Sequence, residues 1–276
     1  MKLLVIGGTG VLSSAVTNEA LNKGIEVTMI NRGNRPIPEG VTFIKADCKD
    51  SDYIKEKLKD CSFDAVIDFI CYSKEQLEHS LNLFLPYVKQ FFFISSTAVI
   101  DNRAGGIFDE DSAKVLPFWD YSVSKWEAEQ FLTASFNTFD KYFTIIRPCV
   151  TYDDTRIPYG IAPRYGFHWT FAARANAGKP IITWNGGVNK CNMMRVEDFA
   201  VGVVGLIGNE KSYNQVFNVC GDEAPSYMDV LDAFANAADI DIHTLDIPGS
   251  FFVNFCKKFR YALIVYVVCN IFDAFF

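Results

Sequence analysis

The sequence contains only three histidines, and its eight cysteines are not arranged as metal ligands. The cysteines are dispersed, with no CxxC pair and no cluster with histidine: Cys48, Cys61, Cys71, Cys149, Cys191, Cys220, Cys256 and Cys269. Zinc sites depend on such pairs and clusters, so we expect no metal site. In a chain of this size, dispersed cysteines are typical of reduced and mostly buried thiols.

Clustered positive charge is also missing. The chain has 26 lysines and arginines against 33 aspartates and glutamates, a formal charge of −7, and no long basic run. Proteins that bind nucleic acid neutralise phosphates with grouped basic side chains. We therefore expect no nucleic-acid partner, and a local basic patch is the alternative.

No apolar run is long enough to span a bilayer. Residues 261–269 are wholly apolar, but a membrane-spanning helix needs roughly 18 to 20 such residues. A buried strand or helix is the favoured interpretation of this run, and a membrane-surface or homodimer contact is the alternative. Met1 and Lys2 lead directly into an apolar strand and leave no room for a signal peptide, so we expect a cytoplasmic location.

A glycine turn between a strand and a helix opens the chain. Residues 3–6 are apolar, Gly7-Gly8-Thr9-Gly10 follow, and residues 11–23 have helical spacing before a second apolar strand at 25–30. This order is the βαβ unit that binds a dinucleotide. A glycine allows the tight turn, another lets the backbone approach a pyrophosphate, and Ser13 fills the third small position at a mild steric cost. We expect these residues to hold the phosphates: Gly7, Thr9, Gly10, Val11 and Leu12.

Strands and helices continue to alternate along the chain. Further strands are predicted at 41–44, 65–70, 91–94, 143–146 and 216–219, with helices at 50–59, 74–87, 121–131, 197–207 and from Ser226 to about Ala238. The strand at 143–146 is expected to stop at Arg147 and Pro148. Such alternation predicts an α/β fold with a parallel sheet covered on both faces, of the doubly wound Rossmann type. Ligands of these folds collect at the carboxyl ends of the strands.

The alternation of strands and helices weakens after Cys149, which suggests two parts with different functions. We expect residues 1–150 to form the NAD(P)-binding core, with residues 188–220 returning to it. Residues 151–187 and 221–276 are then a small substrate-binding region and tail.

Tyr121 and Lys125 lie four residues apart on the predicted helix 121–131, and so on one face of it. A nearby ammonium stabilises a phenolate and lowers the pKa of the tyrosine. Such a pair can exchange a proton with a hydroxyl or carbonyl group while a nicotinamide exchanges hydride. A solvated helix face is the alternative interpretation of this spacing.

Four motifs together resemble the extended short-chain dehydrogenase/reductases, the NAD-dependent epimerase/dehydratase family: Gly7-Gly8-Thr9-Gly10, Ser95-Ser96-Thr97, Tyr121 with Lys125, and Arg147-Pro148. The resemblance covers roughly residues 1 to 240. It implies that Tyr121 is the acid/base and that Lys125 binds the nicotinamide ribose. It also implies that Ser96 orients the substrate, with Thr97 as the neighbouring candidate and a simple loop cap as the alternative for Ser96.

The end of the second strand bears on the choice of cofactor. NAD-binding proteins usually have an acidic residue there, whereas a nearby arginine accommodates the 2′-phosphate of NADP. Asn31, Arg32 and Arg35 stand here instead of an acid, so the sequence favours NADP over NAD. The remaining cofactor contacts implied by the resemblance are Asp47 near the adenine, and Cys48, Phe69, Ile70, Ser95, Pro148 and Val150.

Three departures from the family leave the substrate poorly determined. Thr97-Ala98 replace the Asp-Glu of sugar-nucleotide 4,6-dehydratases, residues 190–196 lack the usual diphosphate-binding pattern of the epimerases, and the tail after about Ser250 is unlike the family's ending. We expect an NAD(P)-dependent epimerase or reductase of a sugar nucleotide or a related small hydroxyl or keto substrate. A non-catalytic, NADP-responsive binding or regulatory protein is the alternative.

Overall fold

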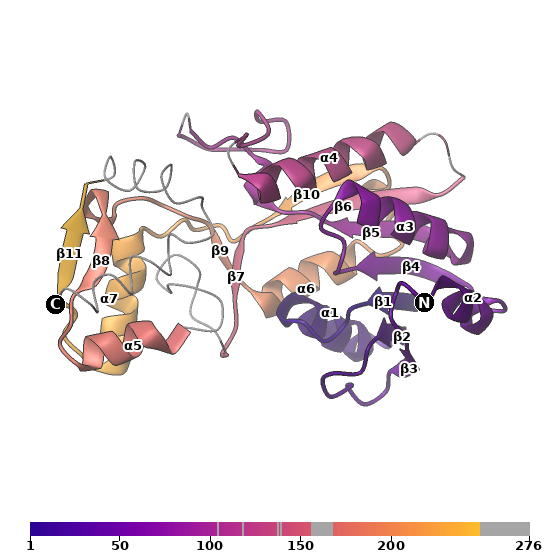
Figure 1. Ribbon diagram of the computed structural model, residues 1–276, viewed down its shortest axis with the longest axis horizontal. Coiled ribbons are helices and arrows are strands. Elements are labelled where there is room, and N and C mark those ends of the chain that lie inside the picture. The colour runs from indigo at the N-terminus through magenta and orange to yellow at the C-terminus, as the bar shows by residue number, and fades with distance from the viewer. Residues whose placement is uncertain (104, 118, 137, 139, 156–167, 249–276) are drawn as a thin grey trace. The chain divides into compact units, whose positions relative to one another are not determined.

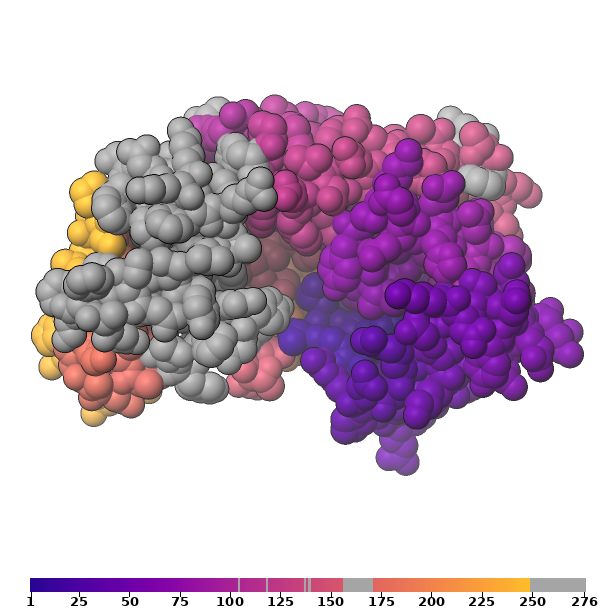
Figure 2. Space-filling view, in the orientation of Figure 1, coloured from indigo at the N-terminus to yellow at the C-terminus, as the bar shows by residue number. Residues whose placement is uncertain are grey.

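The computed structural model describes residues 1–276 except 104, 118, 137, 139, 156–167 and 249–276, which are grey in Figure 1 and Figure 2. The chain forms two compact units. The first comprises Met1–Cys149 and Arg195–Cys220, and the second comprises Val150–Met194 and Gly221–Phe276. The sequence placed the return to the first unit at residue 188, and the structure places it at Arg195. The apolar run at 261–269 lies outside the described residues.

Seven parallel strands form the sheet of the first unit, in the order β10-β6-β5-β4-β1-β2-β3 (Figure 1). Their bounds are Lys2–Ile6 (β1), Glu26–Asn31 (β2), Thr42–Lys45 (β3), Phe63–Asp68 (β4), Val88–Ile94 (β5), Tyr142–Pro148 (β6) and Gln215–Val219 (β10). The chain starts at β1, runs outward to β3, and then returns to place β4 on the other side of β1. The predicted doubly wound parallel sheet is confirmed, and its reversal point lies between β1 and β4, where such folds bind ligands.

Helices cover both faces of this sheet. α1 (Val11–Asn22) packs against α6 (Val196–Gly205) on one face. On the other face, α2 (Ser51–Leu58), α3 (Lys74–Phe84) and α4 (Asp120–Ser135) share one apolar core with the strands (Figure 1). Phe91, Phe92 and Phe93 of β5 are all fully buried. Successive strand side chains point to opposite faces, so this run requires the two-sided cover that the sequence predicted.

Two predicted strand ends differ in the structure. β4 ends at Asp68 instead of residue 70, because the Asp68 carboxylate accepts a hydrogen bond from the Ile70 N–H at 2.8 Å and turns the chain. β6 does not stop at residue 146 but continues through Arg147 and Pro148, which pairs with Val219 of β10. Proline lacks only a donor, and as the last residue of the strand it keeps its place there.

The second unit contains a smaller core. β8 (Ile181–Trp184) and β11 (Thr244–Ile247) pair in parallel, and α5 (His168–Asn176) and α7 (Tyr227–Ala238) pack with them through Phe171, Ile181, Tyr227 and Leu231. β7 (Val150–Tyr152) and β9 (Met193–Arg195) form a further two-stranded sheet. The predicted cap of α7 is confirmed, because the Ser226 hydroxyl accepts from the Asp229 N–H at 3.1 Å.

Two features are absent from the described residues. None of their helices is both long and apolar enough to cross a bilayer. The same residues contain no group of three side chains that could hold a metal ion.

Candidate active site

The glycine turn after β1 has the conformation that its sequence predicted. Gly7 has a φ of +77°, in the left-handed region that favours glycine. A Cβ atom at this position would lie 2.5 Å from the Cγ2 atom of Ile70. The loop after β4 therefore approaches the turn so closely that only glycine fits at position 7.

Ser13 stabilises this turn instead of crowding it. Its hydroxyl accepts from the Gly10 N–H at 2.7 Å and donates to the Gly7 carbonyl oxygen at 2.9 Å. The expected steric cost is thus replaced by two hydrogen bonds from a buried side chain. α1 begins at Val11 and has no acidic residue in its first turn, so its free N–H groups and dipole favour an anion here.

Arginines lie beside the glycine turn at the end of β2. Arg35 donates from Nη1 to the carbonyl oxygen of Thr9 at 2.7 Å, and the Asn31 side chain accepts from the Gly33 N–H at 2.7 Å. Arg32 is exposed in the same loop. The structure thus places the Arg35 guanidinium next to the predicted phosphate-binding turn, with Arg32 in the same loop.

Arg32 is also close enough to affect the Cys48 thiol. Burial raises the pKa of Cys48 to about 12, with further increases from Asp68 and Asp47, while Arg32 acts in the opposite direction. Asp47 is exposed and Cys48 is half-buried at the end of β3. These residues therefore gather at the edge of the sheet where the sequence expected the adenosine.

Ser96 and Tyr121 share a hydrogen bond between their side chains. Ser96 follows β5 and Tyr121 lies in the first turn of α4, so two distant segments meet at the carboxyl edge of the sheet. The Ser96 hydroxyl also accepts from the Ala98 N–H at 3.1 Å. Ser96 therefore both caps its own loop and contacts the tyrosine, while Thr97 donates to the Pro148 carbonyl oxygen at 3.3 Å.

Lys125 is buried, with 2% of its surface exposed, so the Tyr121/Lys125 spacing is not a solvated helix face. Its ammonium donates to the carbonyl oxygens of Cys71 at 2.5 Å and Ile94 at 2.8 Å. It also lies 4.8 Å from the centre of the Tyr72 ring and 5.0 Å from that of Phe93. Burial lowers the pKa of Lys125 to about 8.

The pKa of Tyr121 moves in the direction opposite to the expected one. Burial raises it, the Ser96 hydrogen bond lowers it, and the Tyr72 phenol raises it further. Burial is the main cause, and the Lys125 ammonium does not counter it, because its donors are directed to the Cys71 and Ile94 carbonyl groups and it lies over an aromatic face. The phenol is therefore a proton donor at neutral pH in this structure.

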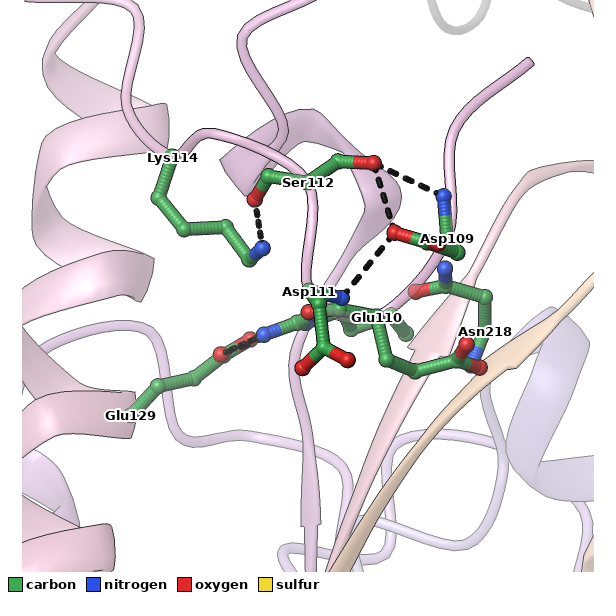
Figure 3. Close-up of polar contacts among 8 residues, drawn as sticks. Asp109, Glu110, Asp111, Ser112, Lys114, Glu129 and Asn218 are labelled. Atoms are coloured by element: carbon green, nitrogen blue, oxygen red, sulfur yellow. Dashed lines mark hydrogen bonds and ion pairs between the residues drawn. The ribbon is translucent and has the colours of Figure 1, made fainter.

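A buried ion pair fixes the loop that leads into α4. Arg147 of β6 donates to Glu129 of α4, with Nη2 2.6 Å from Oε2, and its Nη1 reaches the Glu110 carbonyl oxygen at 3.2 Å. The Glu110 side chain accepts from the Asn218 N–H at 2.6 Å. Figure 3 shows this acidic loop segment between Glu129 and Asn218. The contacts tie the loop to two strands and to the helix that carries Tyr121.

The remaining predicted contacts are spread over the strand ends. Phe69 and Ile70 follow β4, and the Phe69 N–H donates to the Ile6 carbonyl oxygen at 3.1 Å. The buried Ser95 hydroxyl has no hydrogen-bond partner within the described part of the chain. Pro148 ends β6, whereas Val150 begins β7 and belongs to the second unit.

Sequence reasoning missed the buried carboxylate of Asp68. It ends the apolar strand β4 and accepts from Ser80 Oγ at 2.5 Å and from Cys71 Sγ at 3.3 Å. The available signal was an acidic residue inside an otherwise apolar run. The predicted strand 65–70 included Asp68 as an ordinary strand residue. An ionisable side chain is rarely buried without a specific partner.

Comparison with known proteins identifies the family of the chain and solved structures of similar fold. The model of the NAD dependent epimerase/dehydratase family matches residues 3–220. The chloroplast stem-loop binding protein of 41 kDa b from Arabidopsis thaliana is 26% identical over 251 residues, which cover 86% of this chain and 63% of that protein. The chain therefore spans less than two thirds of the length of this curated relative.

Solved structures of similar fold include two sugar-nucleotide epimerases. The UDP-glucose 4-epimerase of Thermus thermophilus, in complex with NAD, has a TM-score of 0.71 at 19% identity, covering 90% of this chain and 86% of that one. The UDP-glucuronic acid 4-epimerase of Bacillus cereus, in complex with UDP-glucuronic acid and NAD, has a TM-score of 0.72 at 18% identity with the same coverage. An epimerase of Methanothermobacter thermautotrophicus has a TM-score of 0.73 at 16% identity, covering 90% and 80%.

Proposed function

The chain belongs to the NAD dependent epimerase/dehydratase family, and we propose that it is an NADP-dependent epimerase or reductase of a sugar nucleotide or a related hydroxyl or keto substrate. The hydrogen-bonded pair of Ser96 and Tyr121, one helical turn from the buried Lys125, carries this proposal. A protein that only binds a nucleotide has no need of a buried lysine beside a tyrosine and a serine at the end of the central strands.

The residues around the glycine turn fit a dinucleotide. Gly7 allows the close approach of the backbone, Ser13 fixes the turn, and the first N–H groups of α1 are free to bind a pyrophosphate. Arg32 and Arg35 would hold the 2′-phosphate of NADP, since no acidic residue stands at the end of β2 to bind a free ribose hydroxyl. The NADP preference rests on these two side chains, because the epimerases of similar fold named above carry NAD.

Tyr121, Ser96 and Lys125 have separate roles in the proposed reaction. The bound nicotinamide supplies the exchange of hydride. Tyr121, kept protonated by burial, would give its proton to a substrate oxygen, and in the reverse direction the phenolate left behind would take that proton back. Ser96 would donate a hydrogen bond that orients the same oxygen, and Lys125 would hold the nicotinamide ribose.

The substrate class is supported by likeness in fold alone. A UDP-glucose 4-epimerase and a UDP-glucuronic acid 4-epimerase share this fold. The Thr97-Ala98 pair argues against 4,6-dehydration, because an acidic pair is needed there for the elimination of water in that family. We therefore favour epimerisation or reduction.

A second candidate function follows from the curated relative. That relative is described as a stem-loop binding protein, which favours a non-catalytic, NADP-responsive binding or regulatory protein as the alternative. The two candidates differ in what Tyr121 must do. Only the enzyme loses its function when the phenol hydroxyl is removed and the fold is kept.

Identification of the co-purified nucleotide tests the proposal first. Protein purified without added cofactor should release NADP or NADPH on denaturation, identified by mass. A screen of UDP- and dTDP-sugars with the loaded protein should then yield a converted substrate. Release of NAD alone would overturn the cofactor assignment, and binding of NADP without turnover of any sugar nucleotide or simple ketone would favour the regulatory alternative.

A further inference from the structure

Asp68 is a fully buried carboxylate that the proposed chemistry does not use. It ends β4, between β1 and β5, with 2% of its surface exposed. Its Oδ1 accepts from the Ile70 N–H at 2.8 Å, and its Oδ2 accepts from the hydroxyl of Ser80 and the thiol of Cys71. Burial raises the pKa of Asp68, and these three donors together with the Lys125 charge oppose that shift, so they stabilise the anion and fix its position against α3.

The segment that Asp68 fixes, residues 69–72, touches both halves of the proposed site. Ile70 packs against Gly7 of the phosphate-binding turn. The carbonyl oxygen of Cys71 accepts from the Lys125 ammonium, and the Tyr72 ring lies under the same ammonium. The Tyr72 N–H in turn donates to the side chain of Gln76 at 2.7 Å. This segment, called the β4 loop below, therefore links the glycine turn to the buried lysine.

The charges that face Lys125 single out the same carboxylate. Asp68 and Cys71 face it from β4 and the β4 loop, Tyr72 from the same loop, and Glu129 from its own helix. Burial and the Asp68 charge hold the pKa of the Cys71 thiol far above its usual range, and burial raises that of Tyr72, so both stay neutral. Glu129 is already paired with Arg147. Asp68 is thus the acidic group that faces the lysine while hydrogen-bonded only by neutral donors.

We propose that Asp68 is a positioning residue for Lys125. The Asp68 carboxylate holds the β4 loop in place and keeps the buried lysine in its ammonium form. The inference rests on the proposed function in that it takes Lys125 to be part of the site. Burial alone lowers the pKa of Lys125, and the negative charge of Asp68 opposes this shift. Without that charge, the lysine would be neutral over more of the working pH range.

The titration of Lys125 tests this directly and needs no substrate. Protein labelled with 13C at the lysine Cε atoms shows one lysine signal that Lys125→Met removes, and its pH titration gives the pKa of the ammonium. Wild type should titrate near pH 8. Asp68→Asn should lower the midpoint by about one unit or more, since an opposite charge is lost from a buried site. Asp64→Asn is the matched control, because Asp64 is an aspartate of the same strand whose partner is the exposed Lys89, 2.9 Å away.

A second variant covers the case in which Asp68→Asn does not fold. Ser80→Ala keeps the carboxylate but removes a donor that stabilises its charge, so it should lower the Lys125 midpoint by a smaller amount, about 0.3 to 0.5 unit. An unchanged Lys125 midpoint in the folded Asp68→Asn protein, or in Ser80→Ala where only that variant folds, overturns the inference.

The activity profile separates this inference from the proposed function. Once a substrate is known, the alkaline limb of the rate should move to lower pH in Asp68→Asn and stay in place in Asp64→Asn. A shifted lysine titration with no turnover of any substrate would contradict the proposed enzyme and leave the role of Asp68 intact. Normal turnover with an unshifted titration and an unshifted alkaline limb would contradict the role of Asp68 and leave the enzyme intact.

Discussion

Arg35 Nη1 lies 2.7 Å from the carbonyl oxygen of Thr9 and donates a hydrogen bond to it. The contact joins the loop after β2 to the glycine turn after β1, which are 26 residues apart in the sequence. A guanidinium group held this close to the turn raises the positive potential where the phosphates of a dinucleotide would lie. Arg32 adds a second guanidinium in the same loop.

The first prediction concerns cofactor preference. Arg32→Ala should weaken NADP binding about tenfold or more, because it removes a charge-assisted hydrogen bond to the 2′-phosphate. NAD binding should change by less than about threefold, because NAD has a hydroxyl group at that position. Fluorescence or calorimetric titration of both cofactors measures this.

Arg103→Ala is the control for that experiment. Arg103 is exposed in the first unit and paired with Asp101 at 2.5 Å, so its removal should leave both affinities unchanged. A wild-type protein that binds NAD more tightly than NADP would contradict the assignment.

The second prediction concerns the buried ion pair. Glu129→Ala should lower the free energy of unfolding by about 3 to 5 kcal/mol, because it leaves the Arg147 charge buried without its partner. Urea unfolding followed by circular dichroism measures the change. Glu19→Ala, which breaks the surface pair with Lys23, should cost less than about 0.5 kcal/mol. Equal losses in the two variants would show that the buried pair has no special role.

The third prediction concerns pH and stability. The pKa of Lys125 is lowered by burial to about 8 in the folded chain, and when the chain is unfolded it returns to the ordinary value of 10.5. Between these pH values the unfolded chain holds more protons, so this residue makes the free energy of unfolding rise with pH. From about pH 7.5 to pH 10, wild type should gain roughly 2 kcal/mol relative to Lys125→Met. Parallel pH profiles of the two proteins would contradict the lowered pKa of Lys125.

The fold was predictable because its signals are local. The glycine turn, the apolar runs of β1, β2 and β5, and the alternation of strands with helices indicate the class and order of the elements. The strand ends were not predictable at β4 and β6. Asp68 turns the chain by a hydrogen bond to Ile70, and Pro148 pairs with Val219, and both contacts depend on tertiary neighbours.

The candidate site was predictable in part for the same reason. The spacing of Tyr121 and Lys125 and the hydroxyls after β5 indicated that these side chains meet at one edge of the sheet. The hydrogen bonds by which Ser13 stabilises the glycine turn, and the burial of Lys125 among carbonyl groups, could not be predicted from the spacing of residues in the sequence. Both depend on three-dimensional orientation. The raised pKa of Tyr121 has the same origin. The cytoplasmic location and the homodimer stay predictions.

The central claim is that Tyr121 exchanges a proton with the substrate. Tyr121→Phe removes only the hydroxyl, so the glycine turn and its hydrogen bonds stay intact and NADP should bind almost normally. The control is Tyr142→Phe, which changes a tyrosine stacked on Tyr213 at the start of β6 and should keep full activity.

The most direct measurement is therefore the turnover rate of Tyr121→Phe on a substrate that wild type converts, at saturating NADP. The account predicts a loss on the order of 10² to 10⁴ in rate with cofactor affinity unchanged within about threefold. Full turnover in Tyr121→Phe would contradict it.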